Sequence, residues 1–169
     1  TLVVDYQEVT ADETLVIDFL AKDFEAIQAW QIDLEFDATQ MEFEEMLGGV
    51  LTNFKEDNLG KSFLEKGILP MVWVAESAAA EGIKIKDDAK LFSLVFKVKS
   101  DFEANEKTFQ IKEDRLLQAA FKNDESLDVK LLLQKRKEKR VVEEKMWVKP
   151  NYPNPFRELT TIKFSLPTD

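Results

Sequence analysis

Two stretches of the chain alternate apolar and polar side chains with a period of two. The first runs from Trp30 to Asp37, with apolar Trp30, Ile32, Leu34 and Phe36 on one side and polar Gln31, Asp33, Glu35 and Asp37 on the other. The second runs from Leu91 to Lys99, where Phe92, Leu94, Phe96 and Val98 share one side. Successive side chains of a strand point to opposite faces, so the pattern predicts two strands with one buried face each. We expect the first to be a central strand of an antiparallel sheet.

Several shorter segments have strand-like composition and are separated by turn-forming residues. They are Leu2–Tyr6, Thr14–Leu20, Val50–Phe54, Gly67–Ala75, Thr108–Lys112, Leu116–Phe121 and Leu127–Leu133. Met41–Phe43 continues the alternation of the Trp30–Asp37 strand after a turn. Residues 55–66 read as a polar loop or one helical turn around 62–66, and residues 114–122 have a short helix as the alternative. Roughly eight or nine short strands without a long helix predict an all-β fold, a two-sheet antiparallel sandwich or a barrel.

The composition excludes several kinds of chemistry but says less about the fold. The 169 residues, 44% of them apolar and 13 of them Phe, suit one domain or one domain with a short appendage. The chain has no Cys and no His, which excludes disulfides, thiolate chemistry and Ser-His-Asp or Cys-His catalysis. Only carboxylates remain as candidate metal ligands. No apolar run approaches the roughly 18 residues of a membrane span, so we expect none.

Charge is distributed unevenly along the chain. Residues 1–134 carry 28 acidic and 14 basic side chains, a net charge of −14, whereas the last 35 residues carry 5 acidic and 9 basic, a net of +4. An acidic body repels phosphate backbones, so we expect no nucleic-acid partner. The basic run 135–140 is expected to lie along its own domain or to act as a flexible tether. The composition predicts a domain at 1–134, a charged linker at 135–150 and a separate segment at 151–169.

The last segment carries a specific motif. Tyr152, Pro153, Asn154, Pro155 and Phe156, followed by the alternating Thr161–Pro167, resemble the start of the C-terminal sorting domain of type IX secretion cargo. That resemblance implies a secreted or cell-surface protein of Bacteroidetes type, although the sorting domain continues for several more strands. With no initiating Met and no signal peptide, we expect the sequence to be a processed or excised piece. The strand Ile162–Leu166 lacks a following partner, so we expect it to be disordered or to pair with a sheet edge, including that of a second molecule.

The body resembles a cohesin domain over residues 1–134. The early strand Thr14–Phe19, the strand Trp30–Asp37 ending in an acidic residue, and the segments Gly67–Trp73 and Leu91–Val98 follow the cohesin order and spacing. The resemblance implies a nine-stranded jelly-roll sandwich, similar also to carbohydrate-binding modules. It further implies a non-catalytic scaffold or adhesion module whose partner, a dockerin or another surface protein, is held by one flat face.

Three groups of oxygen ligands invite a catalytic or metal-binding interpretation. Glu42, Glu44 and Glu45 could form a glycosidase pair, but the solvated face of a strand is the expected arrangement. Asp101, Glu103 and Asn105 have the spacing of a calcium loop without its glycine, so a surface loop is expected there. Asp87 and Asp88 are expected to form a plain turn. We predict no enzyme activity and no cofactor.

Carbohydrate binding, on a secreted polysaccharide-processing protein, is the alternative function. It would need exposed aromatic side chains. Trp30 is expected in the core by its alternation, the position of Trp73 is left open, and Trp147 is expected to pack on a domain surface. The polar row Gln31, Asp33, Glu35 and Asp37 is either a recognition surface or simply a soluble one.

Overall fold

The structure of the protein is a computed structural model. It describes residues 1–7, 9–76, 81–99, 107–112, 119–122, 125–136, 147–148 and 164–165. Backbone contacts divide the chain into two units, Thr1–Lys137 and Glu138–Asp169. In the described part, no helix has the length and apolar character needed to cross a membrane.

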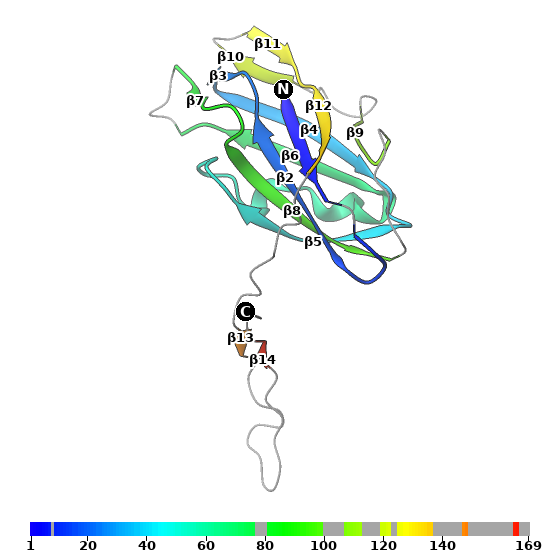
Figure 1. The fold of residues 1–169 in the computed structure, drawn as a ribbon. Helices are drawn as coiled ribbons and strands as arrows, with labels where there is room; N and C mark the ends of the chain where they lie inside the picture. The colour runs from blue at the N-terminus through cyan, green and yellow to red at the C-terminus, as the bar shows by residue number, and fades with distance from the viewer. Residues whose placement is uncertain are drawn as a thin grey trace, which may run out of the picture. The chain divides into compact units, whose positions relative to one another are not determined.

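The first unit is a sandwich of two sheets (Figure 1). One sheet has the order β12-β1-β2-β8-β5, formed by Leu131–Lys135, Leu2–Tyr6, Thr14–Ala21, Lys90–Val98 and Met41–Gly48. The other has the order β11-β10-β4-β6, formed by Glu125–Asp128, Ala119–Lys122, Ala29–Phe36 and Ile68–Val74, with β9 (Phe109–Ile111) pairing with the far end of β4. The described pairs are antiparallel except β1 with β12, so the predicted all-β two-sheet sandwich is confirmed.

Short elements connect the sheets. The strands β3 (Phe24–Ile27) and β7 (Ile83–Ile85) form a small two-stranded sheet. The 3-10 helices η1 (Glu56–Asn58) and η2 (Lys61–Lys66) lead from β5 to β6, which confirms the predicted helical turn. Gly67 ends η2 at a φ of 69°, and a Cβ there would lie 2.0 Å from the carbonyl oxygen of Phe36. Only glycine therefore fits this tight entry into β6.

Aromatic side chains on β8 join the two sheets. Phe92 stacks on Phe19 of its own sheet at a centroid distance of 4.5 Å and on Trp30 of the opposite sheet at 6.0 Å. It also contacts Phe54 at 4.6 Å. Phe96 makes a second cluster with Phe36, Phe43 and Phe109. The alternation read from the sequence at 91–99 thus corresponds to the contacts that hold the sandwich together.

Three segments differ from the sequence-based expectation. Val50–Phe54 was expected to be a strand but is a loop, because β5 passes a bulge after Phe43 and stays paired with β8 as far as Gly48. The expected strand Leu127–Leu133 is two strands, β11 and β12, because its halves join different sheets. The helix alternative for 114–122 is wrong for the described Ala119–Lys122, which is β10. The strands β3 and β7 were not expected.

A polar cluster fixes the chain after β12. Arg136 Nε donates to Asp5 Oδ2 at 2.7 Å, and its Nη2 donates to Asp18 Oδ2 at 2.7 Å. Asp18 Oδ1 also accepts from Ser93 Oγ at 2.6 Å, and Asp18 and Ser93 are buried. Neighbouring strands bring the three partners into one row, since Asp5 lies opposite Asp18, and Asp18 opposite Ser93. The basic run 135–140 therefore begins along its own domain. This was one of the two arrangements expected from the sequence.

The Arg136 cluster gives a stability prediction. Replacing Arg136 with Met removes the positive charge between Asp5 and Asp18, so two nearly buried carboxylates lie close together without a counter-charge. We expect a loss of about 3 kcal/mol of unfolding free energy, measured by chemical denaturation. The exposed Lys97→Met, which changes the net charge equally, should have little effect. Equal losses in both variants would contradict a specific role of the cluster.

The second unit contains one described strand pair. The strand β13 (Trp147–Val148) is antiparallel to β14 (Phe164–Ser165), with Trp147 opposite Ser165 and Val148 opposite Phe164. The expectation that the strand around 162–166 lacks a partner in the chain is therefore corrected for these two residues. The motif residues Tyr152–Phe156 lie outside the described residues.

Candidate functional site

The outer face of the β4–β6 pair carries exposed aliphatic side chains. Val72 lies opposite Gln31 and Val74 opposite Ala29, and residues opposite each other in an antiparallel pair point to the same face. Val72 is 42% exposed and Val74 61%. Phe121, on the other side of Ala29, is half-buried on this face. We call Ala29, Gln31, Val72, Val74 and Phe121 the outer β4–β6 face.

On the described part of the opposite sheet, exposed aliphatic side chains are not adjacent. Leu47 and Leu132 lie on the two edge strands β5 and β12. The Arg136 cluster occupies the row between these edges. Among the described residues of the two sheets, adjacent exposed aliphatic side chains therefore lie on the outer β4–β6 face.

The four polar side chains predicted on one face of β4 do not share one environment. Gln31 and Glu35 are half-buried, and Glu35 Oε1 lies 3.4 Å from Lys112 Nζ. Asp33 is fully buried, which corrects the expectation of a solvated side chain. It lies opposite Pro70, and its carbonyl accepts from the N–H of Lys112, so neighbouring strands flank its short side chain on both sides. Only part of this row is therefore available to a partner.

Asp37 forms a turn at the end of β4. Its Oδ1 accepts from the hydroxyl of Thr39 at 2.6 Å and from the N–H of Thr39 at 2.9 Å. The hydroxyl bond is the first cause, and the N–H bond the second, of a lowered pKa of the Asp37 carboxyl. Asp37 thus shapes the entry into β5.

This turn gives a pH prediction. In the variant Thr39→Ala, the pKa of Asp37 should rise towards its ordinary value of 3.8, because the hydroxyl donor is lost. A lowered folded-state pKa stabilises the fold above the ordinary value and loses this contribution as the pH falls through the folded-state pKa. The wild type should therefore lose more stability on acidification than Thr39→Ala. Carboxyl NMR titration measures the pKa, and Thr39→Ser should retain the wild-type behaviour.

The remaining chemical candidates do not converge. Glu42, Glu44 and Glu45 are exposed on the edge strand β5, and Glu42 pairs with Lys99 at 3.8 Å. A glycosidase acid needs a desolvated pocket, which these exposed residues lack. Asp87 and Asp88 form the predicted turn, in which Asp87 Oδ1 accepts from a backbone N–H.

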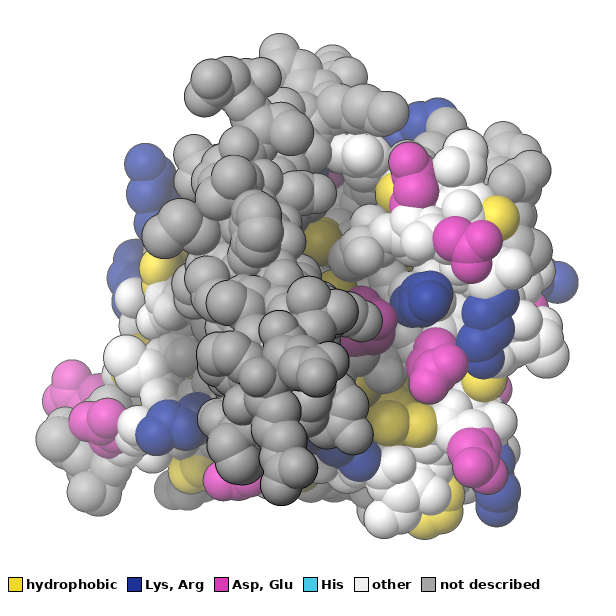
Figure 2. All heavy atoms as spheres, turned by 90° about the horizontal axis from the view of Figure 1, so that it is seen from below, with side chains coloured by type: hydrophobic (Ala, Val, Ile, Leu, Met, Phe, Trp, Pro, Cys, Tyr) yellow, Lys and Arg dark blue, Asp and Glu magenta, His cyan; other side chains and the backbone are white. Residues whose placement is uncertain are grey.

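The metal-binding alternative gains no support. The calcium-loop candidates Asp101, Glu103 and Asn105 lie outside the described residues. Among the described residues, no group of three or more acidic side chains is arranged to hold a metal ion. On the end shown in Figure 2, acidic and basic side chains alternate over the described surface.

Two tryptophans lie in the core. Trp30 is 2% exposed, as its alternation predicted, and Trp73, left open by the sequence, is fully buried. Trp73 Nε1 donates to the carbonyl of Thr52 at 2.8 Å. Neither can stack on a sugar at the surface, which removes both from a carbohydrate-binding platform. The side chain of Trp147 lies outside the described residues.

Comparisons with known proteins agree on one fold. The family model described as "Cohesin domain" matches residues 1–133. The sixth cohesin of Acetivibrio cellulolyticus scaffoldin B, solved with a Cel5 dockerin, has a TM-score of 0.58 at 18% identity and covers 80% of this chain and 98% of its own. An OlpA cohesin from Clostridium thermocellum, solved with a type I dockerin, has a TM-score of 0.57 at 16% identity, covering 80% and 97%. A type II cohesin of Bacteroides cellulosolvens has a TM-score of 0.57 at 13% identity, covering 78% and 95%. Among curated protein sequences, none matches this chain.

Proposed function

The chain belongs to the cohesin domain family, and we propose from this that its first unit is a non-catalytic module that binds another protein, of dockerin type, on a secreted or surface-displayed protein. Cohesins of this fold have been solved in complex with dockerins, including a type I pair from Clostridium thermocellum and a pair from Acetivibrio cellulolyticus. The outer β4–β6 face is the observation that supports placing this contact on particular residues.

The outer β4–β6 face has the physical character of a protein contact. Exposed Val72 and Val74 lie beside the polar side chain of Gln31, so an apolar centre has hydrogen-bonding groups next to it. The flanking strand β10 adds the half-buried Phe121. The core contacts beneath, in which Trp30 lies opposite Trp73, hold this surface rigid, which limits the entropy lost on binding.

A charge placed in this face should abolish binding. Val72→Glu puts a carboxylate into the centre of the proposed contact, and we expect the affinity for a bound dockerin to fall by about 30-fold or more. Isothermal titration against a panel of type I and type II dockerins measures it. The matched control Leu132→Glu changes an exposed residue on the opposite sheet and should bind as the wild type does.

The outcomes test separately whether the chain binds a protein partner and which sheet makes the contact. If Leu132→Glu loses binding and Val72→Glu keeps it, the contact lies on the other sheet. If the wild type binds no dockerin in the panel and captures no protein from the secretome of the source organism, the proposed function itself is wrong. Retention of the native near-ultraviolet circular dichroism confirms that each variant is folded.

The segment 151–167 is proposed to begin a type IX sorting domain. The motif Tyr152–Phe156 and the alternating residues after it support this proposal. A full-length protein that carries this segment is expected to reach the cell surface or medium of a host with type IX secretion. A product retained in the cell would contradict the proposal.

A further inference from the structure

The strand β12 forms one edge of the first sheet. It pairs with β1 in parallel and has no second neighbour among the described strands. The N–H of Leu2 in β1 donates to the carbonyl of Lys130, directly before β12. Backbone groups alternate in direction along a strand, so those of the even-numbered residues of β12 face β1. Those of Leu131 and Leu133 point to the other side, where a further strand could take their hydrogen bonds.

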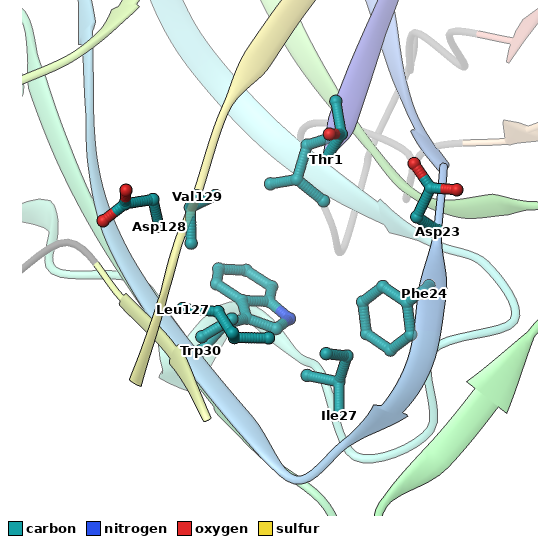
Figure 3. A pocket seen from close by; sticks show the side chains of 10 residues that line it. Thr1, Asp23, Phe24, Ile27, Trp30, Leu127, Asp128 and Val129 are labelled. Carbon is teal, nitrogen blue, oxygen red and sulfur yellow. The ribbon is translucent and has the colours of Figure 1, made fainter. Parts of the chain in front are cut away.

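The side chains of this segment alternate as well. Val129, Leu131 and Leu133 are partly buried and pack against the core. Figure 3 shows Val129 beside Trp30, in the wall of a small pocket that both line. Leu132 points to the outer face of the sheet and is 50% exposed. Packing of its neighbours fixes the strand, so Leu132 cannot turn inward without taking them out of the core.

The other edge strands of the two sheets carry features that prevent pairing with another molecule. In β5 these are a bulge after Phe43 and a run of exposed glutamates. In β6 they are Pro70 and a bridge from Leu59 to Met71, which covers the edge. The strand β11 is only four residues long and is fully exposed. Bulges, charges, prolines and short strands are the usual protection of sheet edges, and the leucines of β12 include none of them.

We propose that β12 pairs in antiparallel orientation with β12 of a second copy of this chain, so that the first sheets of two molecules join into one. The pairing is centred on Leu132, which lies opposite Leu132 of the second copy. Leu131 of each copy then lies opposite Leu133 of the other, and the two exchange the N–H and C=O groups that point away from β1. The contact uses the same residues on both sides, as a two-fold dimer requires.

The chemistry of the side chains favours this register over its neighbours. The two exposed Leu132 side chains meet as a non-hydrogen-bonded pair, in which cross-strand side chains lie closest. Lys130 lies opposite Gln134, so no cation faces a cation there. Centring the pairing on Leu133 would place each exposed leucine opposite a glutamine, and centring it on Leu131 would carry the pairing beyond the strand. A shift by one residue would oppose backbone groups that point in different directions.

The expected dimer is weak and independent of the proposed function. One strand pair buries less than the roughly 1,200 Å² of a stable interface, so we expect a dissociation constant of about 100 μM. The outer β4–β6 face lies on the other sheet and stays accessible in the dimer. Loss of dimerisation would therefore leave the binding of a dockerin unchanged, and the reverse also holds.

Sedimentation equilibrium of the full chain tests the association. The wild type should show a reversible monomer–dimer equilibrium, and Leu132→Lys should weaken it by about tenfold or more, because two like charges would meet at the centre of the contact. Leu47→Lys is the matched control, since Leu47 is also an exposed leucine on an edge strand of this sheet. It should associate as the wild type does. Native near-ultraviolet circular dichroism verifies the fold of each variant.

Single cysteines test the register, because the chain has none of its own. In a buffer of reduced and oxidised glutathione, Leu132→Cys should form a disulfide-linked dimer, since the Cα atoms of such a pair lie about 4.5 Å apart. Gln134→Cys alone should not, because its two copies are offset by four residues, about 13 Å along the strands. A mixture of Lys130→Cys and Gln134→Cys should yield the mixed dimer.

Each of three results would overturn the proposal. The first is a wild type that stays monomeric up to about 1 mM. The second is equal weakening by Leu132→Lys and Leu47→Lys. The third is association of the wild type without linkage of Leu132→Cys, which would assign the contact to another part of the chain, such as the strand expected at Ile162–Leu166.

Discussion

The packing of Phe92 and Phe96 between the sheets is the constraint on which the rest of the structure depends. Both rings project from β8, a central strand of one sheet, and reach aromatic side chains of the other. A sandwich core is close-packed, so these rings fix both the spacing of the sheets and the positions of the strands opposite. Trp30 lies against Phe92, and this contact fixes the position of β4 relative to β8 across the core. The outer surface of β4 is held rigid by the same contacts.

The β1–β12 edge of the first sheet depends on a different interaction, a set of ion pairs. The first and last strands of this sheet, β1 and β12, pair in parallel, so residues far apart in the sequence must meet at one edge. Arg136 then pairs with Asp5 and Asp18 directly after β12. Nearly buried ion pairs contribute little net stability compared with apolar packing, but a wrong register would leave both carboxylates unpaired. The cluster therefore specifies where the domain ends as much as it stabilises the fold.

The two faces of β4 have different roles. Because side chains alternate along the strand, Trp30 packs in the core while its neighbours Ala29 and Gln31 face the outer surface. The outer face offers exposed aliphatic side chains suited to contact with a protein. Trp30 is accordingly a core residue, and not a surface platform for sugars.

The sequence by itself determined the all-β class, the two dominant strands and the burial of Trp30, because side-chain alternation is a local property that the chain carries into any sheet. It also indicated the family through the order of its strands. Only the tertiary structure decided that Asp33 is buried, that residues 127–133 divide between two sheets and that Arg136 meets Asp5 and Asp18. These depend on which strands become neighbours, and neighbours distant in sequence leave no periodic trace. The burial of both Phe24 and Ile27, three positions apart, likewise arises from a bulge between paired strands, which no pattern within β3 alone encodes.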